Sequence, residues 1–441
     1  MAVQKTSAAT LFDLDGIPRL SQAFPLAMQH VVAMIVGCVT PAIIIAGVAK
    51  LNPADKIILI QASLIVAALS TFLQLFPLGN VHGFHLGARL PVILGVSFAY
   101  VPSMVAIAEQ FSIGAILGAQ VIGGICAIIV GMTIRSIRKF FPPLIAGTVV
   151  FTIGLSLYPV AINYMAGGVG SKTFGSWQNW ALAILTLAVV TILNHYGKGL
   201  FKLASILIGM AVGYIVALLC GMVSFTNVAN AGIFQLPSIM YFGMEFQPSA
   251  CIALGILFVV NSIQAIGDFS ATTAGGLDRV PTTDELHGAI LGYGVSNIIG
   301  AFLGCLPTAT YSQNVGIVAT TKVVNRATLG LSACIILVAG LLPKFSALLT
   351  TIPYAVLGGA TVSVFASIAM TGIKLVMTED MNFRNTSIVG LAVALGMGIC
   401  AVPATLAAFP SWVTTIFGKS PVVIATILAI FLNQILPQQN N

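Results

Sequence analysis

Long apolar segments recur along the whole chain, and most are close to the ~20 residues that a helix needs to cross the hydrocarbon core of a bilayer. Proline, glycine and charged residues separate about fourteen such segments, some of them short. They lie near residues 25–47, 57–78, 93–109, 112–132, 144–162, 179–194, 203–222, 249–268, 287–305, 312–324, 329–343, 354–372, 386–403 and 421–436. The pattern predicts an all-α, multi-pass membrane protein in which residues 1–24 form a cytoplasmic N-terminal tail.

The composition agrees with lipid as the main solvent. Residues of the set AVILMFWYC make up 58% of the 441 residues and charged residues only 7%, whereas soluble proteins are about a quarter charged. The net charge of +7 comes from basic residues between apolar segments, which is typical of cytoplasmic loops and not of a nucleic-acid surface.

The basic residues also predict an orientation. With the N-terminus inside, the cluster 135–139, Arg89 and Arg326 fall on the cytoplasmic side, whereas Lys50 and Lys56 depart from the rule. An even number of spans places the C-terminus on the same side. We therefore expect a multi-pass protein of the plasma (inner) membrane with both termini in the cytoplasm.

Two internal echoes indicate that the two halves of the chain are related. The segments Phe141–Gly147 and Ile352–Gly358 each open an apolar span with proline and carry a glycine five positions later. Leu90–Phe98 and Leu306–Gln313 form a second pair, in short spans with polar or Pro/Gly interruptions. The echoes predict two inverted repeats of seven spans. The broken third and tenth spans are the expected place of a transporter's binding site.

An ionisable side chain inside a span is costly, and it is therefore a candidate functional residue. Asp268 follows the apolar run 257–267, and Asn261 and Gln264 precede it at helical spacing, so one helix face carries all three. The alternative is that the span ends near Ile266 and that Asp268 is a solvated cap. The apolar character that continues beyond Asp268 favours the first interpretation.

Polar residues alternate with apolar ones near the start of the tenth span. Thr308, Thr310 and Ser312 recur with a period of two, which is typical of a short extended segment, and Ser312 is predicted to cap a following half-helix. Extended backbone cannot face lipid, so residues 90–100 are expected to supply a partner strand, with Ser97 capping a second half-helix. Two helix N-termini would then face one cavity, which suits a polar, planar or weakly anionic small molecule.

The motif Gln313-Asn314-x-Gly316, followed by Thr321-Lys322, resembles the signature of the nucleobase–ascorbate transporter family, which are nucleobase permeases driven by cation symport. Similar segments are spread over nearly the whole chain: Gln29-His30, Ser97-Phe98-Ala99, Ile263 through Asp268, Pro353 to Gly359, and Asp380-Met381-Asn382 with Arg384-Asn385. The run Ser-Gln-Asn-Val-Gly and residues 167–175 are most similar to bacterial xanthine and urate permeases.

The resemblance implies a role for each residue that matches the signature. Gln313 would hydrogen-bond the edge of the base through its carboxamide, and Phe98 would stack on the base or offer its backbone amide. Asn314 and Gly316 would shape the start of the half-helix. Ser97, beside Phe98, belongs to the same expected substrate-binding set.

Asp268 matches a position that the family uses for cation coupling, and Gln264 stands where most members have a substrate-binding glutamate. A carboxylate accepts from two N–H groups, whereas a carboxamide offers one donor and one acceptor. The purine edge that is read and the coupling route therefore stay open. Thr310 and Asn261 are expected to support the site from behind, and His30 is either a further support or a packed polar residue of the core.

The family architecture implies a core domain (25–140 and 249–345), a gate domain (141–248 and 346–441), a homodimer and elevator-like alternating access. We expect import of a purine base, xanthine or urate, by proton symport. The alternatives are uracil, another nucleobase or ascorbate as the substrate, sodium as the coupling ion, and, more remotely, a passive channel. No enzyme motif, metal site or cofactor site is predicted.

Overall fold

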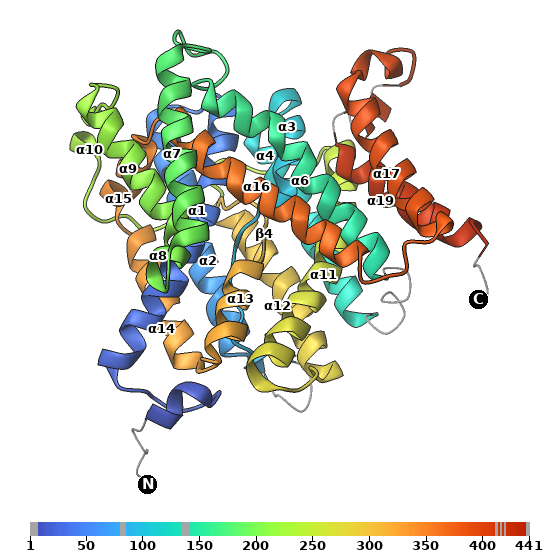
Figure 1. Cartoon of the computed structure of the whole chain (residues 1–441), viewed down its shortest axis with the longest axis horizontal. Helices are drawn as coiled ribbons and strands as arrows, with labels where there is room; N and C mark the ends of the chain where they lie inside the picture. The colour runs from blue at the N-terminus through green and yellow to red at the C-terminus, as the bar shows by residue number, and fades with distance from the viewer. Residues whose placement is uncertain are drawn as a thin grey trace.

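The computed structural model describes residues 8–79, 85–133, 142–410, 413–414, 417–418 and 420–437. Helices make up most of this part of the chain (Figure 1). The first half contains η1 (Ala8–Phe12), α1 (Leu20–Val48), α2 (Pro53–Leu75), η2 (Phe98–Tyr100), α3 (Val101–Gln110), α4 (Ile113–Met132), α6 (Pro143–Met165), α7 (Trp177–Tyr196), α8 (Leu200–Leu203), α9 (Ser205–Leu219) and α10 (Thr226–Asn230).

The second half contains α11 (Pro248–Leu277), α12 (Thr283–Phe302), α13 (Ser312–Thr321), α14 (Arg326–Gly340), α15 (Pro343–Thr350), α16 (Tyr354–Val376), α17 (Phe383–Ala401), η4 (Pro403–Leu406) and α19 (Pro421–Ile435). Four short strands form two antiparallel pairs: β1 (Leu78–Gly79) with β2 (His85–Leu86), and β3 (Leu94–Val96) with β4 (Thr308–Thr310).

Every apolar segment predicted from the sequence coincides with a helix. The third segment combines strand β3 with a short helix, and strand β4 directly precedes the tenth, in the stretch predicted to be extended. Within the described ranges, eight helices are long and apolar enough to cross a membrane, or nine if α14 and α15, bent by 81°, are one span. The chain is therefore a multi-pass membrane protein. The helix α15 and the pair β1–β2 were not predicted, and the basic cluster 135–139 lies outside the described residues.

The eighth predicted segment was too short. It was expected to end at Asp268, but α11 continues to Leu277, and the Asp268 side chain is only 8% exposed. The alternative interpretation of Asp268 as a solvated cap near the end of a span is therefore wrong. The helix continues because small residues beyond Asp268 let α11 pack closely on α13: a Cβ atom built on Gly275 would lie 2.5 Å from the Cβ atom of Ala319.

The start of α12 shows how the sequence sets a helix boundary. The Thr282 hydroxyl accepts from the Glu285 amide (3.2 Å) and the Glu285 carboxylate accepts from the Thr282 amide (2.8 Å), which is a complete capping box. Arg279 donates to both carboxylate oxygens of Glu285, at 2.8 and 2.5 Å. Burial alone would raise the pKa of Glu285, but the hydrogen bonds from Arg279 and Thr282 hold that pKa below its usual range.

The helices pack in two groups. One group consists of α1, α2, α4, α11, α12 and α14, packed around the short helices α3 and α13, and the other consists of α6, α7, α9, α16, α17 and α19. In the second group α6 and α16 lie side by side across the front of the molecule (Figure 1). Their backbones approach closely through small residues, since a Cβ atom built on Gly154 would lie 2.4 Å from the Ala369 nitrogen.

The contacts between α6 and α16 are reciprocal. Each helix follows a proline N-cap and carries a glycine early in its sequence. A Cβ atom on Gly147 of α6 would lie 2.7 Å from the nitrogen of Val376 at the end of α16, and one on Gly358 of α16 would lie 2.3 Å from the nitrogen of Met165 at the end of α6. The two helices are therefore antiparallel. Gly147 and Gly358, the glycines of the first sequence echo, each pack against the end of the other helix.

The N-terminal tail is docked onto the segment that connects α13 to α14. The Asn325 side chain donates to the carbonyls of Thr10 (3.1 Å), Asp13 (3.3 Å) and Gly16 (3.1 Å). Asp15 forms ion pairs with Arg89 (2.7 Å) and with the first residue of α14, Arg326. The tail and these two arginines therefore lie on the same face of the molecule.

Candidate functional site

A two-stranded ribbon lies at the centre of the first helix group, where the third and tenth predicted spans meet. Its register is Leu94↔Thr310, Gly95↔Ala309 and Val96↔Thr308. Just outside the ribbon, the Ser97 amide donates to the Pro307 carbonyl (3.1 Å) and the Tyr311 amide donates to the Ile93 carbonyl (3.0 Å). The two donors, residues 97 and 311, are 214 positions apart, and so are the two acceptors, residues 93 and 307. The two bonds are therefore related by an approximate two-fold axis between the strands.

Side chains from neighbouring helices complete the outer edges of the ribbon. On the β3 side, Thr71 of α2 accepts from the Leu94 amide (3.1 Å) and donates to the Leu94 carbonyl (3.2 Å). On the β4 side, Asn297 of α12 accepts from the Thr308 amide (2.8 Å) and donates to the Thr308 carbonyl (3.3 Å). The backbone groups that lipid could not satisfy are therefore paired inside the protein.

A short helix leaves each strand, and the caps of the two helices differ from one another. Ser97 caps η2 as predicted, because its hydroxyl accepts from the Ala99 amide (3.2 Å). The prediction for the other helix was wrong by one residue: the N-cap of α13 is Tyr311, and Ser312 is the first helical residue. Tyr311 is the position that matches Ser97 under the 214-residue offset, and its hydroxyl donates to the carbonyl of Val96 (2.7 Å).

Asp268 of α11 is bound to the junction between β4 and α13. The Thr310 hydroxyl donates to one carboxylate oxygen (2.5 Å) and the Ser312 hydroxyl donates to the other (2.8 Å). Among the described residues no lysine, arginine or histidine forms an ion pair with this carboxylate. A buried acid held only by neutral hydroxyl groups is an unusual feature at membrane depth, where an unpaired charge is expensive.

Asn314 connects α13 to α1. Its amide group donates to the His30 carbonyl and lies 3.1 Å from the ring nitrogen Nδ1 of His30. Both side chains are almost fully buried, at 1% exposure. This pair anchors the first turn of α13, so His30 is at once a packed polar residue and a support for the signature motif.

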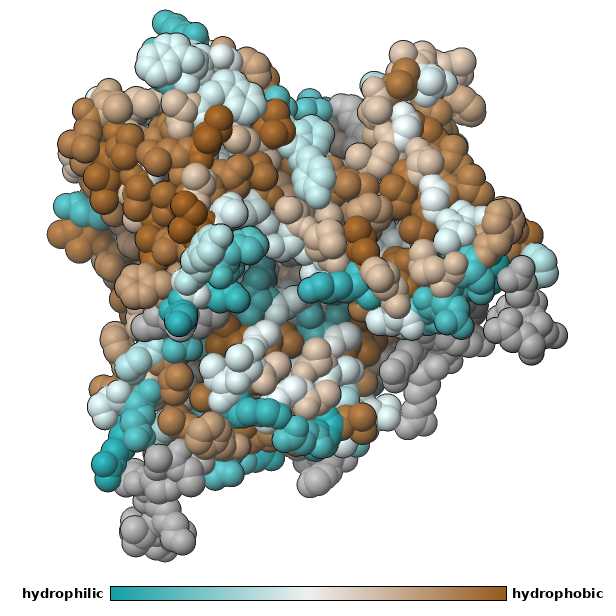
Figure 2. All heavy atoms as spheres, in the orientation of Figure 1, coloured by the Kyte–Doolittle hydropathy of each residue, from teal (hydrophilic) through white to brown (hydrophobic). Residues whose placement is uncertain are grey.

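Two carboxamides near Asp268 are not buried. Gln264 lies one turn before Asp268 on α11 and is partly exposed, and Gln313, next to Ser312, is exposed. A Cβ atom added to Gly267 or Gly316, on the same two helices, would meet nothing within 4 Å. Figure 2 shows hydrophilic side chains around a hollow at the centre of this face, over β4 and the start of α13.

Phe98 closes the site against the second helix group. Its ring is 6% exposed and packs edge-on against Phe365 of α16, with ring centroids 5.0 Å apart and an interplanar angle of 78°. Asn261, predicted on the same face as Gln264 and Asp268, is instead buried, and its amide donates to the Leu257 carbonyl of its own helix (2.9 Å). No hydrogen bond in the described part of the chain joins Asn261 to Asp268.

Some residues at the site were not predicted. Thr71 and Asn297 are buried polar residues of α2 and α12, but each helix carries several other polar residues, so their type alone did not single them out. Phe365 is one of 25 phenylalanines, and no sequence pattern distinguishes it from the others. Its contact with the Phe98 ring depends on how α16 packs against the first helix group.

Comparisons with known proteins identify the family and the fold. Residues 21–405 match the family model described as "Permease family". The chain is 33% identical over 411 residues to the "Xanthine permease" of Bacillus subtilis, covering 92% of each chain, and 32% identical over 425 residues to the "Uric acid permease PucJ" of the same organism, covering 94% of this chain and 92% of PucJ. The fold is similar to the transmembrane domain of the cyanobacterial bicarbonate transporter BicA, with a TM-score of 0.59 at 13% identity over 93% of this chain and 97% of that one.

Proposed function

This chain belongs to the xanthine/uracil permease family, so it is a nucleobase permease and not an enzyme. On that premise, we propose that it is a secondary active transporter that imports xanthine, urate or both together with protons. The printed names of the two Bacillus subtilis relatives support xanthine and uric acid as the substrate class.

The observation that carries the proposal is the arrangement of Gln264 and Gln313 around Asp268. The carboxylate accepts from Thr310 and Ser312, and the two carboxamides beside it, which are not buried, are the groups that we assign to the base. A purine dione presents adjacent N–H and C=O groups, and each carboxamide offers one donor and one acceptor that match such an edge. A site of this kind reads a dione without placing a fixed charge against it.

The helix N-termini complete the proposed site. The first amide groups of η2 and α13 have no partner within their helices, and the positive end of each helix dipole favours a base that carries partial or full negative charge. Because the ring of Phe98 is buried against Phe365, its contribution is the backbone amide. Asn314, Ser97 and Gly316 fix the backbone on which these amides depend.

Asp268 is the residue that we assign to proton coupling. It is the buried acid next to both carboxamides, and its two hydroxyl partners can either donate to a carboxylate or accept from a protonated acid. Protonation therefore changes the bonds within the site without the loss of a partner. We take the proton as the coupling ion because one buried acid is enough to carry it, and sodium is the alternative that the uptake experiment below tests.

We also assign the fourteen segments to two inverted repeats of seven. The reciprocal contacts of α6 with α16 and of residues 93–97 with 307–311 support a two-fold relation between the halves. The first helix group serves as the core domain and the second as the gate domain, and the core moves against the gate of a homodimer during elevator-like access. The ion pairs of Asp15 with Arg89 and Arg326 support cytoplasmic placement of the N-terminus under the positive-inside rule.

Uptake into proteoliposomes tests the function directly. We expect radiolabelled xanthine to accumulate when the lumen is alkaline relative to the medium, with unlabelled xanthine and urate competing better than uracil, adenine or ascorbate. A protonophore should abolish accumulation, and replacement of sodium by choline should not. Equilibration without accumulation would identify a passive channel, and loss of uptake in choline would identify sodium as the coupling ion.

A further inference from the structure

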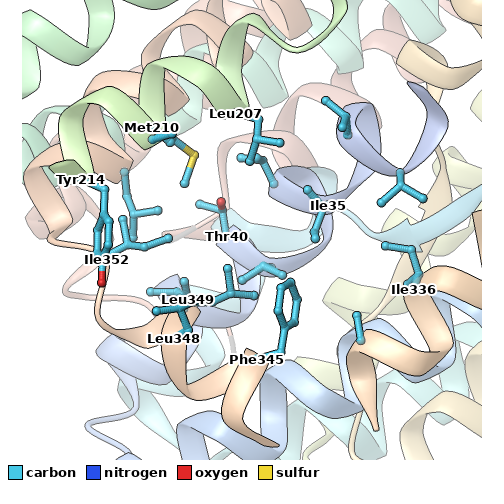
Figure 3. A pocket seen from close by; sticks show the side chains of 18 of the residues that line it. Ile35, Thr40, Leu207, Met210, Tyr214, Ile336, Phe345, Leu348, Leu349 and Ile352 are labelled. Atoms are coloured by element: carbon cyan, nitrogen blue, oxygen red, sulfur yellow. The ribbon is translucent and has the colours of Figure 1, made fainter. Parts of the chain in front are cut away.

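An apolar cavity of about 420 Å³ lies apart from the ribbon and shares no residue with the candidate site. Figure 3 shows α9 on one side, with Leu207 and Met210 directed inward, α1 as the floor with Ile35, and α14 and α15 on the other side with Ile336 and Phe345. The cavity therefore lies between helices of the first group (α1 and α14) and a helix of the second (α9).

The lining is unsuited to a nucleobase. None of the lining residues is charged, and the only polar side chains among them are Thr40 and Tyr214. The Tyr214 hydroxyl is already paired with the Thr351 hydroxyl (2.7 Å), and Thr40 is 1% exposed. A base placed here would leave its N–H and C=O groups unpaired in an apolar environment, which is strongly unfavourable.

The helices that line the cavity also expose apolar side chains on the surface of the molecule, as expected of a surface in the hydrocarbon region. α9 exposes Ile215 (54%), α14 exposes Val338 (57%) and α15 exposes Leu348 (39%). Water does not fill an apolar cavity of this kind, and an empty one loses the van der Waals contacts of its walls. Acyl chains are the apolar groups available at this depth.

We propose that this cavity binds one acyl chain of a bilayer phospholipid, held between α1, α9, α14 and α15. The volume agrees, because a methylene group takes about the 30 Å³ of a liquid water molecule, and the space therefore holds on the order of ten methylene groups. The chain fills the seam between the two helix groups, and its head group stays at the membrane surface. The proposal does not depend on which base or ion is transported.

Photo-cross-linking of the full chain in nanodiscs tests the proposal. The probe is phosphatidylcholine with a diazirine near the end of one acyl chain, and adducts are mapped by mass spectrometry. We expect adducts on residues 207–211 of α9 and 336–345 of α14 and α15 to be about tenfold more frequent than on the exposed helix α17, since the cavity surrounds the bound chain whereas α17 touches passing lipid. Excess unlabelled phosphatidylcholine should reduce them.

Two variants fill the cavity from opposite walls, and a third serves as a matched control. Ala339→Phe and Ala211→Phe, on lining residues, should each lower the cavity adducts about tenfold, because the ring takes the place of the chain. Val338→Phe, on the neighbouring outward position, should leave them unchanged. Cavity adducts no more frequent than those on α17, or unchanged in both filling variants when each is monodisperse, would overturn the proposal.

Discussion

Replacement of Asp268 by asparagine separates coupling from binding. The asparagine side chain has the size of aspartate and can still accept from one hydroxyl group and donate to the other, so the links from α11 to Thr310 and Ser312 can persist. Hydrogen bonds to a charged group contribute about 1 kcal/mol more than neutral ones, so the two bonds together lose about 2 kcal/mol. The fold should survive, but the side chain can no longer exchange a proton.

The size of the effect follows from the driving force. One proton that accompanies a neutral base across 100 mV supplies about 2.3 kcal/mol, which corresponds to an accumulation of about 50-fold. In Asp268→Asn we expect this ratio to fall to about 1, because no proton moves with the base. Exchange of external labelled xanthine for internal unlabelled xanthine needs no net proton movement, and it should continue.

The assay compares accumulation and counterflow in the same proteoliposomes. Asp278→Asn is the matched control, since Asp278 caps the same helix at its exposed end and pairs only with Lys322 (2.7 Å) among the described residues. It should accumulate xanthine as the wild type does. If Asp268→Asn also accumulates xanthine about 50-fold at 100 mV, the assignment of Asp268 to proton coupling is refuted.

Four further predictions concern separate parts of the structure. Gln313→Ala should weaken substrate binding by about 1–3 kcal/mol, or roughly tenfold to a hundredfold, with normal membrane insertion, and unchanged affinity would contradict its assignment to the site. Gln264→Glu should move the uptake optimum to lower pH and weaken urate most, because it places a carboxylate against a weakly acidic base; identical pH profiles and base ranking would exclude this. Ser103 of α3 and Ser420 before α19 share a buried hydrogen bond of 2.7 Å between the two helix groups. A variant with cysteine at both positions should therefore lose transport on oxidation and regain it with reductant. Unaffected transport by the cross-linked protein would exclude relative motion of the two groups at this point. Because the pKa of Glu285 is lowered on folding, the contribution of Glu285 to stability is present above the usual glutamate pKa of about 4.3 and is lost as pH falls through the lowered folded value. The melting temperature in detergent should therefore fall with acidification more in the wild type than in Glu285→Gln.

The sequence predicted the parts of the fold that follow from the solvent. Apolar runs of helix length and polar residues inside them have direct physical costs in lipid, so the helices, the buried acid Asp268 and the paired extended segments could all be found by inspection. The end of α11 could not, because residues 269–277 combine small, hydroxyl and apolar side chains that are compatible with both a helix and a loop. Only the contacts of α11 with α13 decide between the two.

The one-residue error at the start of α13 shows why the site could be located but not built from the sequence. Serine is a strong N-cap residue, and the second sequence echo pairs Ser312 with Ser97, which is a cap. Both observations favoured Ser312 as the N-cap of α13. In the structure, the two-fold crossing of the ribbon fixes Tyr311 opposite Ile93, and this bond leaves Ser312 inside the helix with its hydroxyl free to bind Asp268. Local preference assigns Ser312 to the helix cap. The strand register instead makes Ser312 a hydrogen-bond partner of Asp268, the proposed coupling acid. Register depends on pairing between segments more than 200 residues apart, and no local pattern contains it.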